Sequence, residues 1–126
     1  MAKRGHNRRD YPRMARVNTL LRQILGEELE RIDDDRFALV TFTSVDCESD
    51  LRRAVVYYDS LAGEDGDEEL LEALAEIRLR LQGAIGRQAR LKNTPELRFE
   101  PDQVIRSAQR IDDVLRNLDP PRATDD

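Results

Sequence analysis

The spacing of apolar residues predicts a long helix near the start of the chain. From position 14 to position 32 they recur three or four residues apart, at Met14, Val17, Leu20, Leu21, Ile24, Leu25, Leu29 and Ile32. This spacing puts them on one face of an amphipathic helix of about five turns. Pro12 suits the beginning of the helix, since its missing N–H is not needed in the first turn. The run Asp33–Asp35 ends the helix in a turn.

Two strand patterns follow the first helix. Residues 37–45 and 51–59 are rich in β-branched and aromatic residues and flank a polar turn at 48–50, so they predict a β-hairpin. The second strand alternates, with Ala54, Val56 and Tyr58 on one face and Arg53, Val55 and Tyr57 on the other. One face should pack on helices. On the other face, Arg53 and Tyr57 are either a stacking pair for a nucleobase or ordinary strand residues.

A second helical pattern occupies residues 67–91. Asp67 has the character of an N-cap, and the acids that follow it suit the first turn of a helix. An apolar stripe then runs through Leu70, Leu71, Leu74, Ile77 and Leu81 to Leu91. Gly83 and Gly86 interrupt this stripe, and each glycine destabilises a helix interior by about 1 kcal/mol relative to alanine. Two of them so close together predict a kink or a break into two helices.

The last elements are a short strand and a helix. Pro95 ends the preceding helical pattern, and residues 97–100 are predicted as a third strand. Apolar residues at helical spacing then run from Val104 to Leu118, and Asp119-Pro120-Pro121 stops this helix. The order α-β-β-α-α-β plus a C-terminal helix predicts an α+β domain, a three-stranded sheet with helices on one face. We expect a flexible basic arm at 1–12, one domain at 13–118 and a disordered tail at 119–126.

Charge is distributed unevenly along the chain. The formal net charge is −5, yet residues 1–25 hold seven bases against one acid, and residues 78–99 hold six against one. Residues 59–76 between them hold eight acids and no base. A polyanion responds to the electrostatic potential within about 8–10 Å, so the two basic stretches matter more for its binding than the net charge of the whole chain. They predict either a face for a nucleic acid or simply solvated helix surfaces.

Several classes of function lack their signature. There is no P-loop, no dinucleotide-binding glycine motif, no nucleophile elbow and no His/Cys metal spacing. We therefore expect a protein that is not an enzyme and needs no cofactor or metal. Cys47 is expected to be a small strand residue, and His6 lies in the polar N-terminal segment. No apolar run reaches the roughly 20 residues needed to cross a membrane, and no secretory signal is visible. These features favour a cytoplasmic protein.

Gly83-Ala84-Ile85-Gly86 is formally a GxxG motif. In KH domains this loop joins two helices and clamps a nucleic-acid backbone. The predicted order of elements is also that of a type II KH domain, and it carries more weight than a single short motif.

Motifs along nearly the whole chain, from Arg16 to about Leu118, resemble those of the ribosome-binding factor A family. The similar segments are residues 17–28, 43–46, 49–51, 54–57, Gly86, 90–92, 95–99, Asp102 and 110–111. The most specific is Pro-Glu-Leu-x-Phe at 95–99, which follows a basic helix. The resemblance implies a type II KH-like fold without catalytic site or cofactor. It also implies a monomer that binds the free immature 30S subunit, not the 70S ribosome, near the 5′ end of 16S rRNA. There it would assist late rRNA processing and cold adaptation.

The family replaces the KH GxxG by an Ala-x-Gly kink between the two helices. Counted back from Pro95, that kink falls on residues 77–79, Ile-Arg-Leu, which lack both the alanine and the glycine. The kink is therefore expected either at 77–79, made by other residues, or at 83–86.

The leading hypothesis is an rRNA-binding assembly factor whose basic residues contact phosphates. The candidate residues are Arg78, Arg80, Arg87, Arg90 and Lys92, with Arg8, Arg9, Arg13 and Arg16 as a second region. One alternative is a protein–protein adaptor that uses the acidic helix or a strand edge. Another is a KH domain that reads single-stranded RNA with a base preference.

Overall fold

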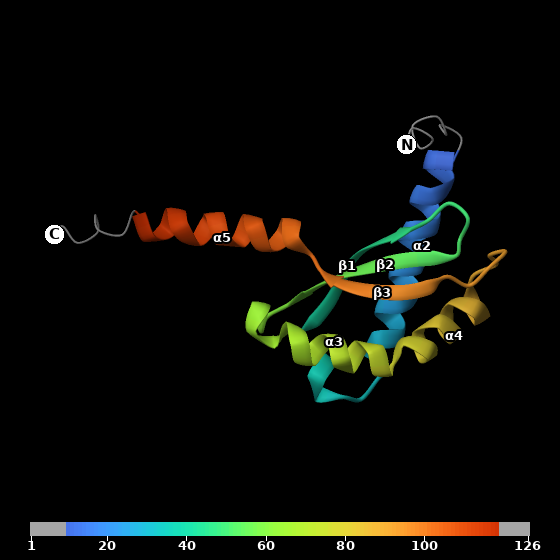
Figure 1. Ribbon diagram of the computed structural model, residues 1–126, viewed down its shortest axis with the longest axis horizontal. Helices are drawn as coiled ribbons and strands as arrows, with labels where there is room; N and C mark the ends of the chain where they lie inside the picture. The colour runs from blue at the N-terminus through green and yellow to red at the C-terminus, as the bar shows by residue number, and fades with distance from the viewer. Residues whose placement is uncertain (1–9, 119–126) are drawn as a thin grey trace.

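The computed structural model describes residues 10–118, and Figure 1 shows the arrangement of their elements. The elements are α2 (Asp10–Glu30), β1 (Val40–Cys47), β2 (Arg53–Ser60), α3 (Asp67–Glu76), α4 (Arg78–Gln88), β3 (Glu96–Pro101) and α5 (Gln103–Leu118), with short 3-10 turns at Asp35–Phe37 and Gly63–Gly66. The predicted α+β class and element order are confirmed. Of the predicted basic arm, residues 10–12 belong to α2. Residues 1–9, with His6, Arg8 and Arg9, and the predicted tail 119–126 lie outside the described residues.

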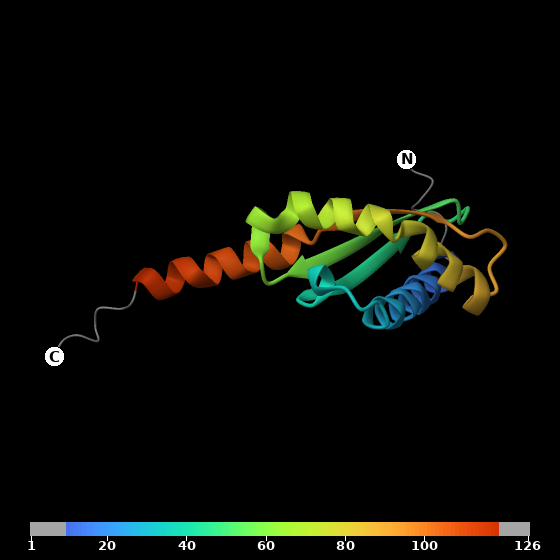
Figure 2. The same ribbon diagram turned by 90° about the horizontal axis from the view of Figure 1, so that it is seen from below.

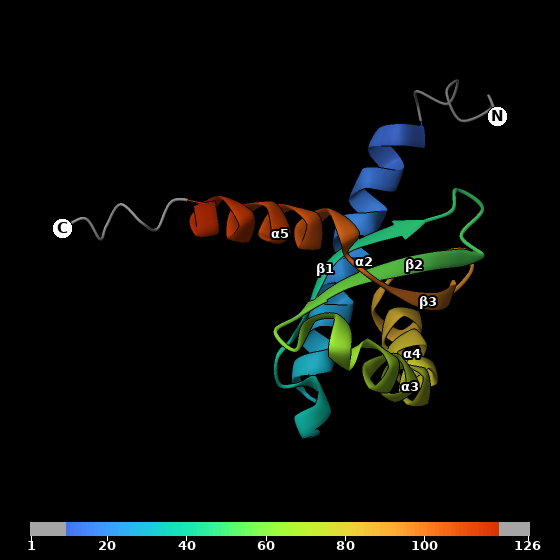
Figure 3. The same cartoon turned by 60° about the vertical axis from the view of Figure 1, so that its left-hand side comes forward.

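The sheet has the order β1-β2-β3, with β2 in the centre. β1 pairs antiparallel with β2 and β2 pairs parallel with β3, with Ala54 opposite Leu97. The predicted alternation in β2 is confirmed, because Ala54, Val56 and Tyr58 are buried. They form one core with the apolar faces of α2, α3 and α4. α2 crosses the sheet against β1, and α4 packs against α2 (Figure 3).

The first strand begins three residues later than predicted. Phe37 lies in the 3-10 turn, where the Asp34 carboxylate accepts a hydrogen bond from the Arg36 N–H. Aspartate side chains stabilise turns in this way, and here that preference outweighs the strand preference of the following residues. Phe37 is still buried and joins the core.

The break between α3 and α4 falls at Ile77, not at the glycines. Ile77 leaves the helical conformation with φ −101° and ψ 6°, and Gly83 and Gly86 lie inside α4. The prediction that these glycines would kink or split the helix was therefore wrong. Leu81, Ala84 and Ile85 bury one face of α4, and this packing holds the glycines in helical geometry. The alternative at residues 77–79 is confirmed, with the break made by isoleucine.

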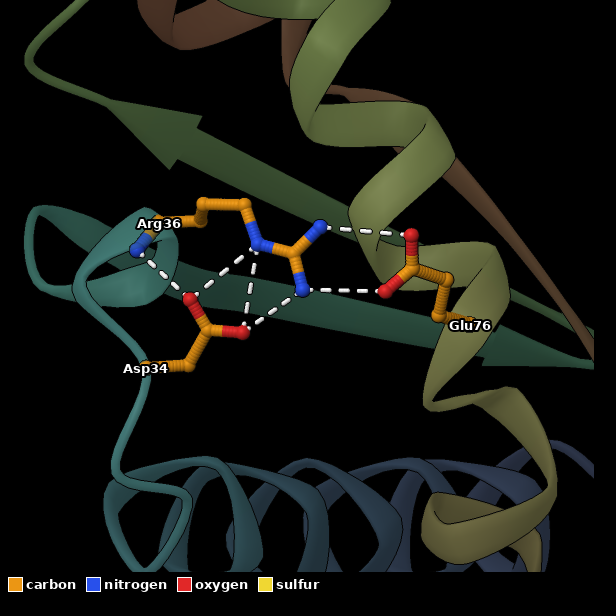
Figure 4. A network of polar contacts seen from close by, with 3 residues as sticks. All are labelled: Asp34, Arg36 and Glu76. Atoms are coloured by element: carbon orange, nitrogen blue, oxygen red, sulfur yellow. Dashed lines mark hydrogen bonds and ion pairs between the residues drawn. The ribbon is translucent and has the colours of Figure 1, made fainter.

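Two ion-pair systems hold the chain on either side of Ile77. Before it, the Arg36 guanidinium bridges the carboxylates of Asp34 and Glu76, with Nη2 to Oε1 of Glu76 at 2.9 Å (Figure 4). After it, Nε of Arg80 donates to Oε2 of Glu28 at 2.8 Å. The break is thus tied to the α2–β1 connection on one side and to α2 on the other.

Glu28 is a buried carboxylate, only 4% exposed, on the core side of α2. It also accepts a hydrogen bond from Arg31 at 3.2 Å. The hydrogen bond from Arg80 lowers the pKa of Glu28 against the opposing effect of burial. A buried carboxylate without partners is unfavourable, so Arg80 is a structural residue that joins α4 to α2.

Asp67 is the first residue of α3 and not its N-cap, which is Gly66. Its carboxylate is used elsewhere. It accepts hydrogen bonds from the Tyr58 hydroxyl at 2.8 Å and from Nη2 of Arg106 at 3.0 Å. Arg106 is 6% exposed and its guanidinium lies 5.8 Å from the centre of the Tyr58 ring. This cluster joins α3, β2 and α5.

α5 forms as predicted, but it projects away from the three packed helices (Figures 1 and 2). Its first turn is fixed by Asp102, whose carboxylate accepts hydrogen bonds from the N–H groups of Val104 and Ile105. Asp102 also accepts a 2.6 Å hydrogen bond from the Thr43 hydroxyl, at the bulge in β1. Together with Arg106, these contacts set the direction in which α5 leaves the sheet.

Replacing Arg80 tests its structural role. Arg80→Met leaves Glu28 buried with Arg31 as its only cation, so we expect a loss of about 1–2 kcal/mol in unfolding free energy. Urea denaturation measures it. Arg78→Met removes a charge from the same helix without breaking an ion pair among the described residues, so it should change stability by less than about 0.5 kcal/mol. Equal effects of the two substitutions would contradict the role assigned to Arg80.

The Asp67 cluster predicts a dependence of stability on pH. The hydrogen bond from Arg106 lowers the pKa of Asp67 in the folded state, assisted by the Tyr58 hydroxyl. The Asp67 carboxylate therefore stabilises the fold fully at a pH above its pKa in the unfolded chain, near about 4. This stabilisation is lost as the pH falls through its lower pKa in the folded protein. We expect Asp67→Asn to cost about 1–3 kcal/mol at pH 7, and this cost to shrink towards pH 2.

Urea denaturation at pH 7 and at pH 2.5 measures the change in that cost. Glu68→Gln, in the same helical turn but exposed, serves as the control and should be close to neutral at both values. A cost of Asp67→Asn that is the same at both pH values would show that its carboxylate charge does not stabilise the fold.

Candidate nucleic-acid interface

A basic groove lies where three segments of the chain meet at one end of the sheet. Its volume is about 470 Å³, and it is lined by Arg13, Ser49, Asp50, Leu51, Arg52, Arg90, Leu91, Lys92 and Asn93. These residues come from the N-terminal part of α2, the β1–β2 turn and the α4–β3 loop. Among residues 10–118, four cations and one carboxylate line it, so its potential is positive. None of these lining residues is aromatic.

The β1–β2 turn forms the floor of this basic groove. Leu51 adopts a left-handed conformation with φ 62°, which costs a residue with a side chain roughly 1–2 kcal/mol. The hydrogen bond from its N–H to the Glu48 carbonyl, 2.8 Å, and the burial of its side chain offset that cost. The Asp50 carboxylate accepts a 3.1 Å hydrogen bond from the Arg52 N–H. These contacts hold Arg52 at the groove.

The α4–β3 loop supplies two more cations. α4 ends at Gln88, because Ala89 turns extended with φ −104° and ψ 141°. Arg90 and Lys92 therefore lie in a loop and not on the helix that was predicted to run to Leu91. The Asn93 amide donates to the Asp50 carbonyl at 3.3 Å, which ties this loop to the turn. Arg13 makes a similar tie from α2, donating to the Ser49 carbonyl at 3.2 Å.

The remaining predicted site residues are distributed over other parts of the molecule. Arg80 is occupied by Glu28, as described above. Arg78 begins α4, at the end remote from the basic groove, and is only partly exposed. Arg87 is exposed on the last turn of α4 and lies back over Gly83, with Nη1 3.4 Å from the position of a Cβ there. Arg16 is exposed on α2, one turn after Arg13.

Arg52 was missed by sequence reasoning. It lies in the hairpin turn next to Arg53, outside both basic stretches, and no local pattern distinguishes the two arginines. The folded chain brings Arg13 and Arg52 together with Arg90 and Lys92, from three segments that are far apart in sequence. The pairing of β3 with β2 places Arg52 beside Arg90 and Lys92, and the hydrogen bond of Arg13 to Ser49 brings in α2.

The open face of the sheet is less suited to a polyanion. Arg53 pairs with Glu48 at 3.4 Å and Arg98 with Glu100 at 2.6 Å. Tyr57 is half-buried opposite Glu100, and burial together with this carboxylate raises the pKa of its hydroxyl. With its cations paired to carboxylates, this face favours the interpretation of Arg53 and Tyr57 as ordinary strand residues.

Cys47 is a buried strand residue, as expected. Burial, assisted by neighbouring carboxylates, raises the pKa of its thiol to about 11, so it is protonated at neutral pH. Within residues 10–118, no group of three or more His, Cys, Asp or Glu is placed to hold a metal ion. The helices of this same range are all too short or too polar to cross a bilayer.

Three comparisons identify relatives of this chain. The family model for ribosome-binding factor A matches residues 13–115. A ribosome-binding factor A from Rubrobacter xylanophilus is 41% identical over 107 residues, covering 84% of this chain and 87% of the relative. The crystal structure of ribosome-binding factor A from Thermus thermophilus superposes with a TM-score of 0.64 at 31% identity, covering 70% of this chain and 94% of that one.

A further structural match is a homology model of the Thermus thermophilus factor fitted into a cryo-EM map of its complex with the 30S subunit. It superposes with a TM-score of 0.56 at 30% identity, covering 68% of this chain and 91% of that one. The fold is thus the α+β, type II KH-like fold of these proteins, with a break at Ile77 in place of the KH glycine loop. On the extent of the family match and the identity to its members, the chain belongs to the ribosome-binding factor A family.

Proposed function

We propose that this protein binds the small ribosomal subunit and that its basic groove contacts phosphates of 16S rRNA. The observation that carries the proposal is the gathering of four cations from three separate segments around one open groove. Family membership supports the small subunit as the partner, since a relative has been fitted into a map of a 30S complex. The role is that of an assembly factor without catalysis, which acts in the cytoplasm on the free immature subunit and assists late processing of the 16S rRNA 5′ end.

Phosphate neutralisation accounts for the binding energy. Each phosphate that a lysine or arginine neutralises releases a condensed counterion, so affinity falls steeply as salt rises. None of the described residues that line the groove is aromatic, which argues against base stacking there. The cations that line the groove, Arg13, Arg52, Arg90 and Lys92, are proposed as the main contacts. Arg16 and Arg87 are exposed outside the groove lining and are proposed as additional contacts. Arg80 is withdrawn from the proposed contacts because Glu28 occupies it.

Reversing two loop cations tests the groove. Arg90→Glu/Lys92→Glu should weaken co-sedimentation with purified small subunits at least tenfold, because two attractive contacts become repulsive. It should also reduce the slope of log affinity against log salt by about two. Arg53→Glu/Arg98→Glu reverses as many charges on the open face of the sheet and should bind like the wild type. Equal weakening by both pairs would show a general charge effect and exclude the groove as the site.

The maturation role has its own test in cells. Deleting the gene should raise the level of 5′-extended precursor 16S rRNA and of free small subunits, most strongly in the cold. Complementation with the wild type or with the open-face variant should reverse this, whereas Arg90→Glu/Lys92→Glu should not. Normal precursor levels after deletion would contradict the maturation role. A protein–protein adaptor would instead show no salt-dependent binding of 16S rRNA in a filter-binding titration.

A further inference from the structure

The apolar face of α5 has no partner among the described residues. Val104, Ala108, Ile111, Leu115 and Leu118 recur at alternating steps of four and three residues, which places them on one face of the helix. The large ones are 57–80% exposed, and Val114 beside them is 53% exposed. A helix that shows such a face to water usually buries it against another molecule.

The base of α5 holds this face away from the body of the protein. Asp102 caps the helix, and the buried Arg106 pairs with Asp67. Farther along, Arg110 donates to Glu64 at 2.7 Å. With the hydrogen bond from Thr43 to Asp102, contacts to three other parts of the chain thus fix the direction of the helix. The family model extends to residue 115, so most of α5 belongs to the family domain and is not an added tail.

The charges on α5 argue against RNA and against a membrane surface as the partner. All three of its cations have carboxylate partners: Arg106 with Asp67, Arg110 with Glu64, and Arg116 with Asp112 at 2.6 Å. Binding to phosphates would require these pairs to break. Helices that lie on anionic membranes carry an excess of lysine and arginine on their polar face, whereas the two exposed arginines of α5 are balanced by Asp112 and Asp113.

The size and width of the face argue against a second copy of this chain. Aliphatic side chains bury less than the roughly 150 Å² of the smallest aromatic, so these partly exposed residues offer on the order of 500 Å² per helix. Stable interfaces need about 800 Å² per partner, so α5 alone is too small for a dimer interface, whereas on the subunit its area would add to that of the basic groove. The pattern Ile111, Val114, Leu115, Leu118 is also wider than a strict coiled-coil seam. It is the pattern of a helix seated in a groove whose walls cover its flanks.

We infer that α5 docks into an apolar groove on a protein of the small ribosomal subunit. The inference rests on the proposed binding to that subunit, and it adds a second, uncharged contact to the phosphate contacts of the basic groove. The partner surface is a groove walled by aliphatic side chains and free of excess charge.

Photocrosslinking tests this contact with the full-length chain. Benzoylphenylalanine in place of Leu115 should crosslink, on purified immature small subunits, to a single ribosomal protein. The adduct should resist ribonuclease and be lost after protease treatment. The same probe in place of Asn117, on the polar side of α5, is the control and should give little of this adduct. Adducts of the Leu115 probe with rRNA or with a second copy of the chain would overturn the inference.

A third probe, in place of Arg90, separates the two proposals. If it crosslinks to the subunit and the Leu115 probe does not, the α5 contact is wrong and the groove proposal stands. If the wild-type chain fails to co-sediment with small subunits at all, both proposals fail.

Substitutions provide an independent readout. Ile111→Asp/Leu115→Asp should weaken co-sedimentation at least tenfold while the salt slope stays as in the wild type, because no phosphate contact is lost. The matched pair Gln109→Asp/Asn117→Asp adds the same charge on the polar side and should bind like the wild type. Equal weakening by both pairs, or by neither, would overturn the inference.

Discussion

The parallel pairing of β3 with β2 determines where the interaction surfaces of this protein lie. Parallel strands begin at the same end of a sheet, so the loop before β3 must lie beside the turn before β2. The register sets Arg53 opposite Glu96, and the N–H of Glu96 donates to the Arg52 carbonyl at 2.9 Å. The basic groove is a consequence of this pairing. At the other end of the same two strands, the Asp102 N–H donates to the Tyr58 carbonyl at 2.8 Å, where α5 starts.

The same pairing requires the chain to cross from β2 to β3 over one face of the sheet, through α3 and α4. The crossing has to bend, and it bends at Ile77, which no proline or glycine marks. On the two sides of the bend, Glu76 pairs with Arg36 and Arg80 pairs with Glu28. Arg80 is therefore part of the scaffold that supports the groove, and reversing its charge would disturb the fold and binding together.

The spacing of apolar residues predicted most of the fold because one core buries the apolar faces of the sheet and of the helices packed on it. The buried positions of α2, β2 and α4 all follow from spacings of two, three or four residues. The errors arose where a side chain acts on the backbone or on a distant element. Asp34 stabilises a turn, although the residues after it favour a strand. Asp67 was expected to cap α3 and instead pairs with Arg106. Arg52 could not be assigned to the site because its neighbours there come from α2 and the α4–β3 loop.

Ion pairing separates the structural cations of this acidic chain from those available to a polyanion. Arg36, Arg80, Arg106 and Arg110 each have carboxylate partners that join different elements. Arg52, Arg90 and Lys92 make no ion pair with any described residue, and they line one groove. A net charge of −5 is therefore compatible with a local phosphate-binding surface, since most carboxylates lie elsewhere or are already paired. On α5, ion pairing neutralises the cations. The apolar face is therefore the feature of this helix that a partner can recognise.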